Sequence, residues 1–183
     1  MTFGVPAILP PAWYVMLEPD SPPPESYLQL GRHWAAATGG TFNAMPHVTV
    51  GYLQAHASRH EVARSLCNVA GAELTIRGRT LVSFRDDPHP IFGYTLSLAV
   101  EDDEDLRAWS ERVVEALAPF GPAERGATPH IQVLRGMGIP PQEAIQLLSA
   151  TDWTLTFTVT QLVASQFITD FHQFLRWPLE SPP

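Results

Sequence analysis

Two short segments of this chain, Pro46 to Val50 and Pro129 to Val133, are near copies of each other. Each reads proline, histidine, apolar, polar, apolar, and the two histidines, His47 and His130, lie 83 positions apart. In a β-strand, side chains two positions apart point to the same face of the sheet. The duplication therefore predicts two strands, each with a histidine and a hydrogen-bonding side chain on one face. A chain that repeats such a strand is expected to fold into two similar halves that share one site.

The polar partners of the two histidines are Thr49 and Gln132. Unperturbed imidazole titrates near pH 6.5, so one histidine can accept a proton while the other donates one. The Thr49 hydroxyl and the Gln132 amide can both donate hydrogen bonds to phosphate oxygens, where negative charge develops in a transition state. This set of side chains predicts acid–base chemistry on a phosphodiester, and that chemistry requires no metal and no cofactor.

Composition places the chain among globular proteins. Its 183 residues, 45% of them hydrophobic, suit one domain or two closely joined lobes. No apolar run is long enough to span a bilayer, and the N-terminus lacks the basic and apolar regions of a secretory signal. The single cysteine, Cys67, lies beside an apolar helical stripe and is expected to be buried. We expect a cytoplasmic monomer that does not bind membranes.

Charge narrows the range of partners. The net charge is −8, and all 11 basic residues are arginine. Without lysine, the chain cannot use a Schiff-base lysine, a lysine adenylate or a phosphate loop ending in Gly-Lys-Ser/Thr. The acidic balance argues against a broad electrostatic contact with long nucleic acid. A small phosphorylated substrate, or the end of an oligonucleotide, is the expected partner.

The order of elements also repeats. Each half reads strand, helix, histidine strand, helix, strand, which predicts one α+β domain over residues 1–183 with two pseudo-symmetric lobes. Motif one occupies residues 47–50 and motif two residues 130–133. The predicted elements of the first half are 12–18, 26–38, 47–53, 58–70 and 73–84. Those of the second half are 91–100, 102–118, 130–134, a short helix that Pro140 and Pro141 open, and 153–168, with a final edge strand over 171–179.

The two motifs resemble those of the two-histidine (2H) phosphoesterase superfamily, in its 2′-5′ RNA ligase-like and cyclic phosphodiesterase branch. That family carries histidine, apolar, threonine or serine, apolar once in each lobe. Here the pattern stands as His47-Val48-Thr49-Val50 and as His130-Ile131-Gln132-Val133. The resemblance in element order extends over roughly residues 12 to 179. An arginine just after the second motif, here Arg135, is also common in the ligase-like branch.

The resemblance implies a bilobal, LigT-like fold, with two antiparallel-sheet lobes flanked by helices around a central cleft. It implies metal-free hydrolysis, or reversible formation, of 2′-linked nucleotide phosphodiesters such as 2′,3′-cyclic phosphates and short 2′-5′ oligonucleotides. His47 and His130 would be the catalytic acid–base pair, with Thr49 as a phosphate ligand. Which histidine is the acid, which base is preferred and whether the product is a 2′- or 3′-phosphate stay open.

Further candidates come from the residues themselves. Arg135 could contact phosphate with its planar, two-pronged guanidinium, or lie at the solvent edge of its strand. Tyr14, Phe92 and Tyr94 are candidates for stacking on a nucleobase. His56 and His60 lack cysteine or carboxylate neighbours at metal-ligand spacing, so we interpret them as surface residues.

Gln132 departs from the family pattern because it is longer than threonine and has no hydroxyl. It can still donate a hydrogen bond, so we expect phosphate binding in an altered pose. Two alternatives to the leading hypothesis therefore stay open. One is hydrolysis of cyclic dinucleotide or oligonucleotide signals, and the other is a catalytically weak module that binds nucleotides or RNA ends.

Overall fold

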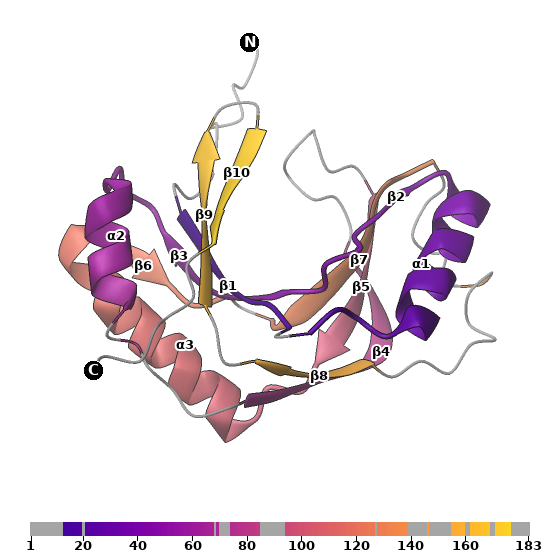
Figure 1. Ribbon diagram of the computed structural model, residues 1–183, viewed down its shortest axis with the longest axis horizontal. Coiled ribbons are helices and arrows are strands. Elements are labelled where there is room, and N and C mark those ends of the chain that lie inside the picture. Colours follow the sequence, from indigo (N-terminus) through magenta and orange to yellow (C-terminus); the bar gives the residue numbers. More distant parts are fainter. Residues whose placement is uncertain are drawn as a thin grey trace, which may run out of the picture.

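Ten strands form one curled sheet, and every recorded pairing between them is antiparallel (Figure 1). The computed structural model describes residues 13–19, 21–67, 69, 74–84, 94–126, 128–138, 146, 155–159, 162–168 and 171–176. The elements in chain order are β1 (Trp13–Leu17), α1 (Glu25–Thr38), β2 (Thr41–Phe42), β3 (Val48–Leu53), α2 (Arg59–Leu66), β4 (Leu74–Phe84), β5 (Tyr94–Val100), α3 (Glu104–Leu117), the short 3₁₀ turn η1 (Ala118–Phe120), β6 (Ala123–Glu124), β7 (His130–Met137), β8 (Leu155–Val159), β9 (Leu162–Ile168) and β10 (Phe171–Arg176).

The strand order divides the sheet into two lobes that meet between the two histidine strands. The order is β10-β9-β1-β3-β7-β5-β4-β8, with β2 added to β7 and β6 added to β3. Each lobe borrows strands from the other half of the chain. β4 precedes β5 in the sequence but pairs with it in the second lobe, while the late strand β9 pairs with β1 in the first. The expected α+β fold with two antiparallel lobes is confirmed, and the halves of the chain interleave to build it.

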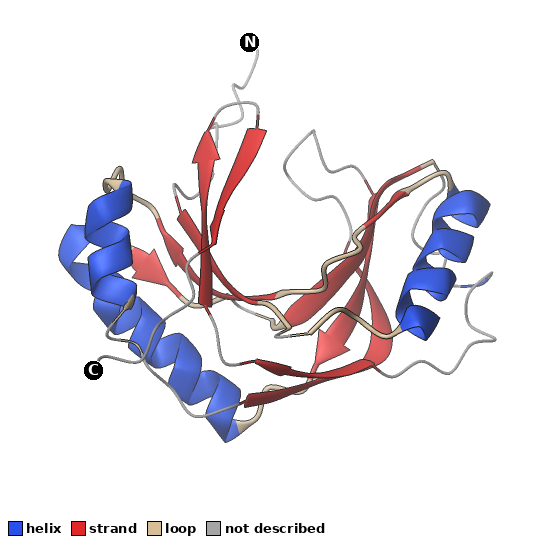
Figure 2. Cartoon of the chain, viewed as in Figure 1, coloured by secondary structure: helices blue, strands red, loops and turns tan. Residues whose placement is uncertain are grey.

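The helices cover the outer side of the curled sheet (Figure 2). Like the strands, α1 and α3 each pack on a histidine strand from the other half of the chain. α3 packs on β3 and on α2, while α1 packs on β7 and β2. The spacing of Leu106, Trp109, Val113 and Leu117 predicts one buried face for the helix over 102–118, and all four side chains are buried in α3. Asp103 caps this helix by accepting a hydrogen bond from the Leu106 amide at 2.9 Å. Among the described helices, none is long and apolar enough to cross a membrane.

Two glycines allow the helices to lie close to the sheet. A Cβ on Gly51 of β3 would lie 2.6 Å from Val113 of α3, and a Cβ on Gly31 of α1 would lie 1.9 Å from the Phe42 ring. Gly51 therefore marks the side of β3 that faces α3. A third glycine, Gly39, ends α1 in the left-handed conformation with φ 71°, as the Gly39-Gly40 pair predicts.

Three expectations about the elements change. The alternating segment 153–168 is not one strand, because β8 lies at one end of the sheet order and β9 lies next to the strand at the other end. The helix expected over 58–70 is shorter, because α2 already ends at Leu66 with Cys67 as its C-cap. A capping box between Ser58 and Glu61 sets its start. Cys67 is exposed at the end of α2, so its expected burial is wrong. Of the short helix expected after Pro141, only Gln146 is described, and it is helical; the strand end at Trp153 lies outside the described residues.

Candidate active site

One backbone pairing sets the two histidine motifs side by side. β3 and β7 are antiparallel, and Val48 lies opposite Ile131. Continuing this register by one residue in each direction places His47 opposite Gln132 and Thr49 opposite His130. Residues that face each other across antiparallel strands point to the same side of the sheet. The two histidines then lie on the diagonal of this square, a relation that typically separates residues by about 7–8 Å.

Burial shows which side of the sheet each residue takes. Val48, Val50, Ile131 and Val133 are at most 1% exposed, whereas His47, Thr49, His130 and Gln132 are all half-buried. The apolar set lies on the side of the sheet that α1 and α3 cover. The four polar side chains therefore occupy the opposite side, inside the curve of the sheet (Figure 1). The alternation expected from the sequence is present in both strands.

A register shift falls at the last residue of each motif. In β3 the pairing with β1 shifts just after Thr49, and in β7 the pairing with β5 shifts just after Gln132. A bulge of this kind bends a strand and re-aims the next side chains. It brings Tyr52 to the same side as Thr49, although the two lie three positions apart in the sequence. The sequence carries no signal for these shifts, because the residue at each of them, Val50 or Val133, is an ordinary valine.

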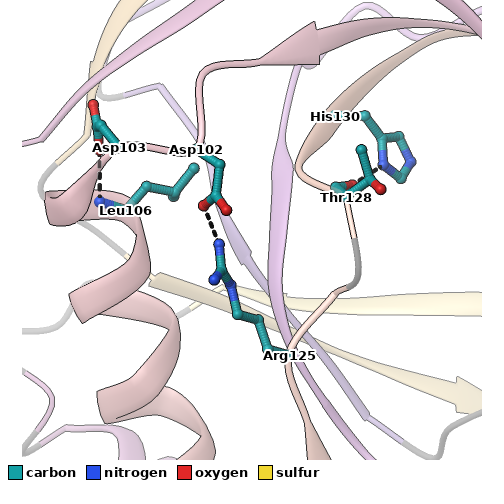
Figure 3. A network of polar contacts seen from close by, with 6 residues as sticks. All are labelled: Asp102, Asp103, Leu106, Arg125, Thr128 and His130. Atoms are coloured by element: carbon teal, nitrogen blue, oxygen red, sulfur yellow. Dashed lines mark hydrogen bonds and ion pairs between the residues drawn. The ribbon is translucent and has the colours of Figure 1, made fainter.

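Both imidazole rings are held in the same way. Nδ1 of His47 lies 3.2 Å from the Met45 carbonyl oxygen, and Nδ1 of His130 lies 2.9 Å from the Thr128 carbonyl oxygen (Figure 3). A carbonyl oxygen only accepts, so Nδ1 carries the hydrogen in both rings. In the neutral form, Nε2 is then the basic atom of each ring. The same tautomer on both histidines suits a pair that takes and returns a proton through Nε2.

A buried proline between each carbonyl and its histidine explains this repeated contact. Pro46 and Pro129 are both buried. Proline fixes its own φ and restricts the preceding residue to extended conformations, so the carbonyl two residues before the histidine has little freedom. The prolines are visible in the duplicated motif, yet their role as supports for the imidazole was not predicted.

Asn43 connects the two motifs and was missed by the sequence analysis. Its Nδ2 donates to the Gln132 carbonyl at 3.0 Å, and its backbone N–H donates to the Val133 carbonyl at 2.8 Å. Its own carbonyl accepts from the Tyr27 hydroxyl at 2.8 Å, and burial raises the pKa of that hydroxyl. Asn43 thus fastens the segment that leads into His47 to the strand that carries Gln132. An asparagine four residues before a histidine gives no recognisable signal in one sequence.

Replacing Asn43 by alanine is expected to loosen this connection. The loss of the hydrogen bond to Gln132 costs about 0.5–1.5 kcal/mol of unfolding free energy. We expect kcat to fall about 10–100-fold, because a small misplacement of catalytic groups is sufficient for such a loss. Urea unfolding and steady-state kinetics measure both, with Gln54→Ala, an exposed position after β3, as the control. Unchanged kcat would show that Asn43 does not position the site.

Two of the remaining candidates, Arg135 and Tyr14, lie on different strands. Arg135 is exposed in β7, and its backbone pairs with Thr41 of β2. Tyr14 lies opposite Tyr52, and the two rings meet edge to face with centroids 5.2 Å apart. Tyr52, which was not predicted, therefore joins Tyr14 on the inner side of the sheet.

Tyr94, at the start of β5, is the exposed large hydrophobic residue of the described chain, at 38%. Phe92 lies outside the described residues.

His56 and His60 are both exposed, and His60 contacts Arg64 at 2.6 Å. No group of three or more histidine, cysteine, aspartate or glutamate side chains gathers among the described residues. Closer to the second motif, Arg125 forms an ion pair with Asp102 on the segment before α3 (Figure 3). Neither Arg125 nor Asp102 is among the site residues that the sequence predicts.

Comparisons with known proteins bear on the family and on the fold. The family model described as the 2′-5′ RNA ligase superfamily matches residues 22–166, which include both motifs. No curated protein sequence matches the chain significantly.

Several solved structures share the fold. E. coli LigT in its apo form superposes with a TM-score of 0.57 and 16% identity, covering 92% of this chain and 96% of LigT. The MHV ns2 PDE domain gives a TM-score of 0.55 and 16% identity, covering 91% of this chain and 99% of that domain. Usb1 of Kluyveromyces marxianus gives 0.52 and 11%, covering 90% and 97%.

Proposed function

The chain belongs to the 2′-5′ RNA ligase superfamily, and from that membership we propose that it is a two-histidine phosphoesterase. Its substrates are small nucleotides or RNA ends with a 2′-linked phosphodiester, above all 2′,3′-cyclic phosphates and short 2′-5′ oligonucleotides. The observation that carries the proposal is the pairing of Val48 with Ile131, which sets both histidines and both polar partners on one side of the sheet.

The chemistry follows from this placement. Water attacks the phosphorus atom while one imidazole takes its proton at Nε2, and the bond from phosphorus to the leaving ribose oxygen breaks. The other imidazole, protonated, gives its proton to that oxygen. Thr49 and Gln132 donate hydrogen bonds to the non-bridging oxygens, on which negative charge accumulates. In a joining reaction the 5′-hydroxyl of one RNA end takes the place of water. It attacks the 2′,3′-cyclic phosphate of the other end and gives its proton to one imidazole, while the bond from phosphorus to the 3′-oxygen breaks and that oxygen takes a proton from the other imidazole.

Substrate size is inferred from charge and from the related structures. The net charge of −8 disfavours contact with long nucleic acid, which binds through many basic residues. E. coli LigT has been solved in complex with 3′-AMP, a mononucleotide. The Tyr14–Tyr52 pair on the inner side of the sheet offers one aromatic surface for a single base. These points together favour a mononucleotide-sized substrate.

The proposal is tested by incubating purified protein, in EDTA, with a panel of four 2′,3′-cyclic nucleotides, short 2′-5′ oligonucleotides and signalling cyclic dinucleotides. We expect turnover of the first two groups with a bell-shaped dependence of kcat/KM on pH, because one histidine must be neutral and the other protonated. Turnover of cyclic dinucleotides alone would replace the substrate class. Failure to turn over any member would contradict the proposal.

Gln132 supports a second candidate function, a nucleotide-binding module with weak catalysis. The register of the Val48–Ile131 pair puts it opposite His47, where the family pattern has threonine or serine, and its longer side chain would hold a phosphate in a different position. The same panel distinguishes the two functions when binding is measured by calorimetry. Binding of a cyclic nucleotide with no turnover would favour the module, while binding with turnover favours the enzyme.

A further inference from the structure

The two histidines lie in matching frameworks, but their neighbours differ in charge. β1 pairs with β3 as β5 pairs with β7, and the register shift falls at the same step in both pairs. Corresponding positions can therefore be compared one by one. In the first lobe, β1 places Met16 opposite Thr49 and Leu17 opposite Val48. In the second lobe, β5 places Ser97 opposite Gln132, Leu98 opposite Ile131 and Ala99 opposite His130.

The next position along β1 in this register is Glu18, which falls opposite His47. Its counterpart on β5 is Ala99, which pairs with His130. One histidine thus faces a carboxylate and the other faces a methyl group. Opposing residues on antiparallel strands have Cβ atoms about 4.5–5.5 Å apart, within reach of a glutamate and an imidazole.

Glu18 is unusual in its burial. It is only 7% exposed, and it is the one acidic residue among the buried side chains of the described chain. A buried carboxylate is costly unless a positive charge or hydrogen bonds compensate it. A protonated imidazole opposite the carboxylate supplies that charge. Conversely, a carboxylate within about 4–6 Å favours the protonated form of a histidine and raises its pKa.

The other groups around the two rings do not reverse this bias. From β7, His47 faces the neutral Gln132 and, on the diagonal, His130; in its own segment it contacts the Met45 carbonyl. His130 faces Ala99 from β5 and Thr49 from β3. Arg125 and Asp102, which Figure 3 shows together with His130, form an ion pair, so their opposite charges nearly cancel.

We propose that Glu18 is a positioning residue that keeps a proton on His47, so that during opening of a cyclic phosphate His47 donates the proton to the leaving oxygen and His130 accepts it from water. This assignment of roles rests on the proposed phosphoesterase function. The effect of Glu18 on His47 is separate from catalysis and can be measured without a substrate.

The direct test is an NMR titration of the imidazole rings of His47 and His130 in the whole protein. Glu18→Gln removes the charge and keeps the shape of the side chain, and we expect the midpoint of His47 to fall by about one pH unit while that of His130 stays in place. Glu111→Gln, on the exposed side of α3, removes the same net charge at a distance and is expected to move neither. An unchanged His47 midpoint, or an equal shift of both rings, would overturn the proposal.

The pH dependence of kcat/KM tests the assignment of roles. The general acid must be protonated, so its titration sets the falling limb at high pH, and the base sets the rising limb at low pH. Glu18→Gln is expected to move the falling limb about one unit toward lower pH and leave the rising limb in place. The mirror variant Ala99→Glu is expected to move the rising limb toward higher pH. Movement of the rising limb in Glu18→Gln would reverse the roles.

The two levels of the proposal fail in different ways. If no cyclic nucleotide is turned over, the phosphoesterase function is wrong, and the imidazole titration still decides whether the Glu18 carboxylate raises the pKa of His47. Far-UV circular dichroism checks that Ala99→Glu folds, since Ala99 is half-buried in β5. If that variant does not fold, the limb that moves in Glu18→Gln alone decides the roles.

Discussion

Replacing His47 or His130 by alanine is expected to reduce kcat/KM by about 10²–10⁴-fold, the contribution of one general acid or base. Both rings act in one transition state, so the double variant should lose little more than the worse single variant. Each substitution also removes one contact from Nδ1 to a carbonyl, which costs about 0.5–1.5 kcal/mol of unfolding free energy. The folded fraction at assay temperature should therefore be nearly unchanged.

His33→Ala is the matched control for this prediction. His33 is exposed on α1, on the outer side of the sheet, and has no place in the proposed chemistry. Steady-state kinetics with a 2′,3′-cyclic nucleotide at the optimal pH measure all four variants. If either histidine variant retains wild-type kcat/KM, or if the losses of the two single variants multiply in the double variant, the paired acid–base mechanism is contradicted.

Ile131→Ala is expected to lower the unfolding free energy by about 2–5 kcal/mol, the usual cost of emptying a buried isoleucine site. Ile131 is fully buried, pairs with Val48 across the two lobes and pairs with Leu98 on its other side. It lies directly between His130 and Gln132 in sequence, so the cavity forms beneath the site. Ile131→Val, which removes one methylene, should cost only about 0.5–1.5 kcal/mol and keep activity.

Urea unfolding of the two variants and of Gln29→Ala tests this expectation. Gln29 is exposed on α1, and its replacement should change the unfolding free energy by about 0.5 kcal/mol or less. A loss in Ile131→Ala no larger than that of the control would mean that the contact between β3 and β7 contributes little to the fold. The two histidine strands would then be held together by other contacts.

Local patterns in the sequence were sufficient for much of this fold. The alternation around each histidine predicted which side chains share a face, because side-chain direction in a strand depends only on position. The apolar spacing of residues 102–118 predicted the buried face of α3 for the same kind of reason. Gly39 marked the end of α1, since a left-handed residue is needed there.

Features that depend on distant partners could not be predicted. The segment 153–168 alternates throughout, and nothing local indicates that β8 joins β4 while β9 joins β1 at the other end of the sheet. The same limit applies to Asn43, whose hydrogen bond reaches a strand 89 residues away. A role for Glu18 beside His47 follows only from the register of β1 with β3, because a glutamate next to a proline carries no signal in the sequence.

Cys67 shows a different limit. It lies next to the apolar stripe of α2, but the helix ends at Leu66 and the cysteine turns outward at the cap. Helix ends are set by caps and tertiary contacts that differ by a residue or two from what spacing suggests. Burial is therefore harder to predict for a residue in the last turn of a helix than for one in its middle.

The proposed mechanism requires both imidazoles to contact one phosphate. A crystal structure of the protein with a bound nucleoside monophosphate tests this requirement directly. It should show a single phosphate with one oxygen within hydrogen-bond distance of His47 Nε2 and another within that distance of His130 Nε2, and Thr49 and Gln132 donating to the same group. A phosphate that contacts only one of the two rings, or that binds away from them, would contradict it.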